Sequence, residues 1–211
     1  MKRRIALLVL VVVAIALAVA LVPPPGPRSI RTFEPSRLAD LELRMWQAYY
    51  AKQNVRLFGL LVTLLREQYR YSWATATREA FHLARAAATF GNARSNYEVV
   101  LPDLEAAYGT ARQWLQARFD SSAVARSELA WWVARRVPGQ NSPAQIGGLI
   151  ADEYALLYET PRESVLEAAR LRAEAAALRD AQAAQPDWER IGRLLLDSYV
   201  ALAAGVGSKA T

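Results

Sequence analysis

The stretch IALLVLVVVAIALAVALV, residues 5–22, is an unbroken apolar run that decides how the rest of the chain is placed. It follows Lys2, Arg3 and Arg4 and precedes the proline-rich segment PPPGP at 23–27. As a helix that rises about 1.5 Å per residue, the run would be roughly 27 Å long, close to the ~30 Å hydrocarbon core of a bilayer. We therefore predict an N-terminal membrane anchor over 1–22, in which residues 5–22 form a single transmembrane helix.

The basic residues that precede the run predict its orientation. Lysine and arginine beside a span are retained on the cytoplasmic side, so we expect a cytoplasmic N-terminus and an extracytoplasmic (periplasmic) remainder at a bacterial-type cell membrane. A cleaved secretory signal is the alternative, because Ala18 and Ala20 fit the small-x-small cleavage rule. The run continues through Leu21 and Val22 without a polar region, which favours an uncleaved signal-anchor. Both alternatives export the rest of the chain.

Composition limits the chemistry and the partners. The chain has no cysteine, which excludes disulfides, thiolate metal sites and cysteine nucleophiles. Its formal net charge is +6, and Lys2, Arg3 and Arg4 supply three of the positive charges. The exported part is therefore only modestly basic, and we expect no nucleic-acid partner.

The chain divides into a linker, a domain and a tail. Residues 23–35 are rich in proline and arginine and predict a stiff spacer, with the alternative that Arg28, Arg31 and Phe33 lie against the domain or the lipid headgroups. After the linker, proline and glycine are scattered along the chain rather than clustered. No stretch shows the alternation of apolar and polar residues that is typical of strands. We predict a helical domain over 36–204 and a flexible tail over 205–211.

Helix-start signals divide this domain into an all-α, irregular antiparallel bundle of about six or seven helices. A long first helix is expected from Ser36 to about Tyr71. Two capping boxes with proline at the first helical position, Ser142-Pro143-x-Gln145 and Thr160-Pro161-x-Glu163, mark later starts. The other helices are expected over 72–90, 102–118, 121–137 and about 186–205.

Glu79 and His82 form a Glu-x-x-His pair of the type that binds metal in di-iron bundles, where glutamates from other helices complete the site. Glu42, Glu128 and Glu153 are candidates for that role. Such sites need two Glu-x-x-His pairs, and His82 is the only histidine of the chain. The sequence therefore favours a hydrogen-bonded or solvated histidine, and we predict no metal and no cofactor.

Two acidic residues lie among aromatic side chains at helical spacing. Glu42 is close in sequence to Trp46, Tyr49 and Tyr50, and Glu128 is close to Trp131, Trp132 and Arg135. A carboxyl on an apolar face has a raised pKa unless an arginine or a tyrosine satisfies it. One hypothesis is therefore an envelope enzyme that uses Glu42 and Glu128 as paired carboxylates. The other hypothesis is a buried Glu–Arg or Glu–Tyr network that ties helices together. It is favoured because spacing along the sequence does not show that the two acids meet.

Adjacent aromatic residues point about 100° apart on a helix, so one of Tyr49 and Tyr50, and one of Trp131 and Trp132, is a candidate to reach solvent or a partner. Exposed Trp, Tyr and Arg are the residue types that anchor interfaces, and the alternative is that they divide between the core and the contacts between helices. The candidate residues for an interface or a buried polar network are Glu42, Trp46, Tyr49, Tyr50, Glu128, Trp131, Trp132 and Arg135.

The sequence contains no recognised catalytic motif, which favours a non-enzymatic role. We predict a membrane-tethered, extracytoplasmic helical domain that binds a protein partner, as a scaffold, an adaptor or an accessory subunit of an envelope complex. The paired-carboxylate enzyme and the metal-binding bundle at Glu79 and His82 are the alternatives.

Overall fold

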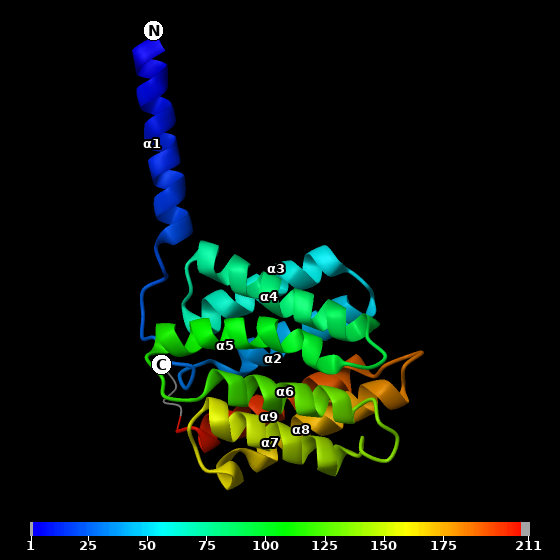
Figure 1. Ribbon diagram of the computed structural model, residues 1–211. Helices are drawn as coiled ribbons and strands as arrows, with labels where there is room; N and C mark the ends of the chain where they lie inside the picture. The colour runs from blue at the N-terminus through cyan, green and yellow to red at the C-terminus, as the bar shows by residue number, and fades with distance from the viewer. Residues whose placement is uncertain (1, 208–211) are drawn as a thin grey trace.

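The computed structural model describes residues 2–207, and its side chains at 5 and 9–207. Within this range the chain forms nine α-helices and one short 3-10 helix, without a β-strand (Figure 1). The prediction of an all-helical chain is confirmed. Most of the predicted tail, 208–211, lies outside the described residues.

The N-terminal helix α1, Lys2–Leu21, extends away from the other helices as a separate rod (Figure 1). Its large apolar side chains from Val9 to Leu21 are more than a third exposed. Over the part of the chain whose side chains are described, no helix combines the length and the apolar character required to cross a membrane.

The linker does not remain free of the domain. The Arg28 guanidinium lies 3.7 Å from the ring centroid of Trp114. The Arg31 guanidinium donates to the main-chain carbonyl of Glu159 at 3.1 Å. The free spacer predicted over 23–35 is therefore wrong for its second half, which packs against the domain as the alternative interpretation expected.

The single long helix predicted over 36–71 is wrong. The structure has two helices here, α2 (Pro35–Tyr50) and α3 (Asn54–Tyr69). Between them Lys52 has a left-handed backbone with φ of 56°. The sequence at 51–54, AKQN, carries no large apolar side chain that would hold a continuing helix against the core. The bundle therefore has one helix more than the sequence predicts.

The remaining α-helices begin within two residues of the predicted starts. They are α4 (Trp73–Asn92), α5 (Leu101–Leu115), α6 (Ser121–Ala134), α7 (Pro143–Leu157), α8 (Arg162–Ala181) and α9 (Trp188–Gly205). The short 3-10 helix η1 (Tyr97–Val100) was not predicted. The Ser142 hydroxyl caps α7 by accepting from the Gln145 amide at 3.3 Å. Two predicted caps are wrong: Glu34, not Ser36, caps α2, and α8 starts without a side-chain cap from Thr160.

The helices α2 to α9 form a ring. Each helix packs on its neighbours in the chain, and α9 packs on α2, which closes the circle. In Figure 1 the ring is flattened, with α5, α6 and α7 in front of α2, α9 and α8. This closed arrangement is more regular than the irregular bundle that the sequence predicts. The buried apolar residues gather in clusters between the helices of the ring.

Helix α8 is the most closely packed part of the ring. Its buried residues are Val165, Ala168, Ala169, Ala173, Ala175 and Ala176, and small side chains let α7 and α9 approach it on both sides. A Cβ atom added at Gly205 would lie 2.0 Å from the Ser164 carbonyl oxygen, so α9 requires glycine there. The close approach fixes how α7, α8 and α9 present their polar residues to the interior.

Candidate functional site

Three glutamates and one arginine from four different helices are joined inside the ring. Glu42 comes from α2, Glu128 from α6, Glu153 from α7 and Arg172 from α8. Two of the glutamates are almost completely buried: Glu42 is 4% exposed and Glu153 is 6% exposed. The cluster has two parts, which we name the arginine half and the acid half.

The arginine half consists of Glu42, Arg172 and Tyr199. The Arg172 Nε atom donates to Glu42 Oε1 at 2.9 Å, and the ion pair brings Nη2 within 2.7 Å of the same oxygen. The Tyr199 hydroxyl donates to Glu42 Oε2 at 2.8 Å, so both carboxylate oxygens are engaged. Burial alone would lower the pKa of Arg172, but the Glu42 carboxylate holds that pKa well above its usual value. Arg172 therefore remains charged and compensates the buried Glu42.

The acid half consists of Tyr108, Glu128, Trp131 and Glu153. The Trp131 indole donates to Glu153 Oε2 at 2.5 Å. The Tyr108 hydroxyl is 2.8 Å from Glu128 Oε2 and 3.4 Å from Glu153 Oε1. A phenol has one proton to donate, so it satisfies both acids only when one of them is protonated and donates to the phenol oxygen.

The protonation of the acid half agrees with this geometry. Burial raises the pKa of Glu128 to about 8, and the nearby Glu153 carboxylate adds to the increase. Burial also raises the pKa of Glu153. Two neighbouring carboxyls without a cation of their own cannot both be ionised at low cost. At neutral pH the acid half therefore retains a proton.

Arg172 also connects the two halves. Its guanidinium lies 5.2 Å from the ring centroid of Trp131, in cation–π distance. Its positive charge lowers the pKa of both Glu128 and Glu153, although burial outweighs this effect. The cluster is thus one network that contains a single arginine for three carboxyl groups.

The chemistry available to this network is limited by its contacts. Both oxygens of Glu42 are engaged by Arg172 and Tyr199, so Glu42 has no unengaged oxygen for a substrate. Glu42 and Glu128 belong to the same network, but they are connected only indirectly, through Arg172 and Trp131. The carboxyl group paired with Glu128 is that of Glu153, and the Tyr108 hydroxyl lies between them. The geometry is that of a network of polar contacts that connects six helices, α2, α5, α6, α7, α8 and α9.

The other candidates on α2 lie in different surroundings. Trp46 packs against the buried residues Ile191 and Leu195 of α9. Tyr50 lies under Arg179, whose guanidinium is 3.1 Å from the ring centroid. Tyr49 is 47% exposed and is the only large aromatic side chain of the candidate set that reaches solvent to this extent. Of the two adjacent tyrosines, Tyr49 therefore reaches solvent and Tyr50 packs against the protein.

The candidate residues on α6 and just after it also have different contacts. Trp131 belongs to the acid half, whereas Trp132 packs edge-on against Phe90 at 5.2 Å between ring centroids. Arg135 forms an ion pair with Asp180 of α8 at 2.5 Å. Both tryptophans are therefore engaged with the ring rather than presented to a partner.

Glu79 and His82 have separate partners. Glu79 is 1% exposed and accepts from Arg78 Nε at 2.8 Å. His82 Nδ1 lies 2.8 Å from Asp103 Oδ1, and the Arg85 hydrogen bond to Asp103 lowers the pKa of that carboxyl. Among the residues whose side chains are described, no group of three or more His, Asp or Glu side chains is placed to hold a metal ion.

Sequence reasoning did not identify the role of Arg172, because the segment around it alternates Arg, Glu and Ala and suggests a solvated face. The sequence signal that could have identified Arg172 is its position on the apolar stripe of the helix, which runs from Val165 through Ala169 to Ala176. Glu153 lies on a similar stripe between Ile150 and Leu157. A charged residue on an apolar stripe indicates a buried polar partner.

No protein-family model, no curated protein and no solved structure matches the chain. A functional conclusion therefore depends on the arrangement of its own residues.

Proposed function

We propose that the protein is a single-pass membrane protein that presents a helical ring outside the cytoplasm as a docking domain for other proteins. In this role α1 is the anchor, with a cytoplasmic N-terminus. The ring acts as a scaffold, an adaptor or an accessory subunit of an envelope complex.

The observation that carries the proposal is the exposure of α1. Leu10, Ile15 and Leu21 are 68%, 58% and 59% exposed, and the apolar run of the sequence continues without a polar residue from 5 to 22. A helix that is apolar on all sides requires an apolar environment, either a protein core or lipid. Such an extensive apolar surface favours burial, and the sequence run 5–22 would be roughly 27 Å long as a helix, close to the ~30 Å hydrocarbon core of a bilayer.

The interior network favours docking over catalysis. Its carboxyl groups are engaged by Arg172, Tyr199, Tyr108 and Trp131. Groups held in this way make the ring rigid and fix its surface, which suits a scaffold. On the outer surface, Tyr49, Leu196 and Val200 are apolar side chains that are more than a third exposed. Aromatic and aliphatic anchors of this type carry much of the binding energy of protein interfaces.

The anchor is tested by washing membranes at alkaline pH after expression of the full chain. We expect the protein to remain in the membrane pellet, while a variant with Leu10, Val12 and Ile15 each changed to Asp is released. Release of the unchanged chain would contradict the anchor.

The docking role is tested by cross-linking in intact cells, followed by purification in mild detergent. We expect one or a few cross-linked proteins in fixed ratio to the chain, and weaker cross-linking of a Tyr49→Ala, Val200→Asp variant. Recovery of the chain as a monomer without cross-linked protein would contradict the role.

A further inference from the structure

The face of the ring formed by α3 and α4 lies next to the end of α1. In Figure 1 these two helices are the part of the ring closest to α1, and their axes run across the direction of α1. Helix α1 also packs on α4. Ala20, near the end of α1, lines a shallow surface hollow together with Phe58 of α3 and Trp73 and Phe81 of α4. The apolar surface of α1 is thus continuous with this face.

This face carries two well-exposed aromatic side chains. Phe81 is 55% exposed and Trp73 is 46% exposed, both on α4. Val55, in the first turn of α3, is 90% exposed. The Arg66 guanidinium stacks on Trp73 at 3.9 Å from the ring centroid. Tryptophan beside arginine is typical of residues that lie at the level of lipid headgroups.

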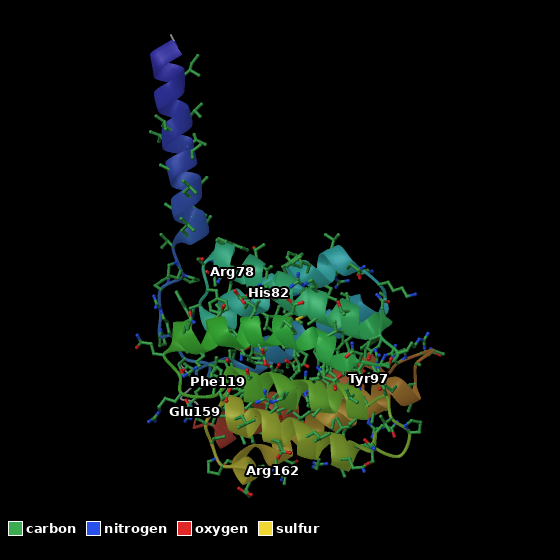
Figure 2. The ribbon with its side chains drawn as sticks, viewed as in Figure 1. Arg78, His82, Tyr97, Phe119, Glu159 and Arg162 are labelled. Atoms are coloured by element: carbon green, nitrogen blue, oxygen red, sulfur yellow. The ribbon has the colours of Figure 1, made fainter. Side chains whose placement is uncertain are left out.

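Basic and acidic residues are distributed unevenly over the ring, and the segment that contains α3 and α4 has more basic than acidic residues. Residues 52–92, which contain α3 and α4, carry six basic and two acidic residues. Residues 143–181, which contain α7 and α8, carry four basic and seven acidic residues. Figure 2 shows Arg78 and His82 on the side of α1, and Glu159 and Arg162 on the opposite side. The segment that lies nearest the end of α1 therefore carries an excess of basic residues, and the segment on the opposite side carries an excess of acidic residues (Figure 1).

We infer that the α3–α4 face lies against the anionic headgroups of the same membrane that holds α1. This inference rests on the proposed anchor. The second half of the linker packs on the ring through Arg28 and Arg31, so little chain remains to separate the ring from the end of α1. If α1 crosses the bilayer, the α3–α4 face is the one directed toward its surface. Exposed apolar and basic side chains at this place match the interfacial region of an anionic membrane.

Lipid is favoured over a protein occupant by geometry. A partner protein on this face would have to fit between the ring and the bilayer from which α1 emerges. Exposed positions on other helices of the ring, such as Val200 of α9, have no such restriction. The ring therefore uses one face for lipid and leaves the other faces for protein partners.

The absence of native cysteine makes a direct test possible, because a single introduced cysteine is the only labelling site. Phe81→Cys and Val200→Cys form a matched pair, since the two native side chains are 55% and 53% exposed. Each full-length variant is labelled with an environment-sensitive fluorophore and reconstituted in vesicles of equal parts phosphatidylcholine and phosphatidylglycerol. Quenching is measured with aqueous iodide and with lipids that carry a nitroxide at the headgroup.

We expect the probe at Phe81 to be quenched severalfold more by the nitroxide lipid than the probe at Val200, and severalfold less by iodide. Vesicles of phosphatidylcholine alone should reduce this difference. Equal quenching of both probes would overturn the inference. Protection at Phe81 that appears only after a second protein is added would overturn it as well, because it would assign the face to that protein.

A charge-reversal pair tests the basic component. Lys52→Glu with Arg56→Glu changes the charge of the α3–α4 face, and Arg126→Glu with Arg190→Glu makes the same change at exposed positions of α6 and α9. We expect only the first pair to increase iodide quenching at Phe81. Equal effects of the two pairs would contradict an electrostatic contribution.

The failure of this inference can be distinguished from the failure of the anchor. Flotation of the vesicles after an alkaline wash reports on α1 alone. A chain that does not float contradicts the anchor, whereas a chain that floats with a water-exposed Phe81 probe contradicts only the docking of the α3–α4 face.

Discussion

Both halves of the interior network bury carboxyl groups, but the charge of these groups is dealt with differently in each half. In the arginine half, the buried charge of Glu42 is compensated by a cation, Arg172. In the acid half, Glu128 and Glu153 have no cation of their own and retain a proton, because burial raises the pKa of each. The arginine half contains its own compensating cation, whereas the retained proton of the acid half makes the stability depend on pH. This difference leads to three experiments of decreasing effect.

The largest effect is expected from Arg172→Met, measured as thermal unfolding of the full chain in mild detergent by circular dichroism. The substitution leaves Glu42 buried without its cation and removes the contact with Trp131. Breaking a buried pair from one side typically costs about 3–5 kcal/mol. The control is Arg170→Met on the same helix, where the pairs with Glu167 and Glu174 are exposed and the loss should be below about 1 kcal/mol. Similar losses for both variants would contradict a compensated interior charge.

The second effect is a dependence of stability on pH. The folded pKa of Glu128 is about 8, above the unfolded value of about 4.3. Between these values the folded state binds a proton that the unfolded state lacks, so the free energy of unfolding falls as the pH rises. The slope is at most about 1.4 kcal/mol per pH unit for one proton. We expect this decline over pH 5 to 8 in unfolding curves recorded at several pH values.

The matched variant is Glu128→Gln, which keeps an oxygen that can accept from Tyr108 and does not titrate. Its stability should change less between pH 5 and 8 and should exceed that of the native chain at the upper end. Below about pH 4 a second loss is expected in both proteins, because Asp103, whose pKa is lowered by Arg85, becomes protonated. A Glu128→Gln curve that parallels the native curve would contradict a proton held in the acid half.

The smallest effect is expected from Tyr108→Phe, which removes the hydroxyl between Glu128 and Glu153. Loss of one hydrogen bond to a partly buried carboxyl costs about 1–3 kcal/mol. Tyr97→Phe is the control, since the Tyr97 hydroxyl bonds only to the exposed Arg94 carbonyl, and its loss should stay within about 0.5 kcal/mol. Equal losses in thermal unfolding would show that the Tyr108 hydroxyl does not join the two acids.

Helix boundaries could be predicted from the sequence where the signals are local. Ser142 with Pro143 marks a helix start that the structure reproduces, because capping depends only on neighbouring residues. The break at Lys52 was missed, since a left-handed residue other than glycine has no clear sequence signal. Local chemistry thus predicts where most helices begin but not every place where one ends.

The network could be predicted only in part. The sequence indicated that Glu42 and Glu128 lie among aromatic residues and that an arginine or a tyrosine could satisfy them. It could not identify Arg172 and Tyr199 as the partners of Glu42, because those contacts depend on the closure of the ring by α9 on α2. Partners separated by well over a hundred residues are set by tertiary packing, which one-dimensional spacing does not contain.

The location of the ring is the central claim, and one labelling experiment tests it most directly. Val200→Cys on α9 provides a single exposed thiol on the full chain. We expect a membrane-impermeant maleimide to label this thiol in intact spheroplasts, and a cysteine inserted before Lys2 to react only after lysis. Labelling of Val200→Cys only after lysis would place the ring in the cytoplasm and contradict the account.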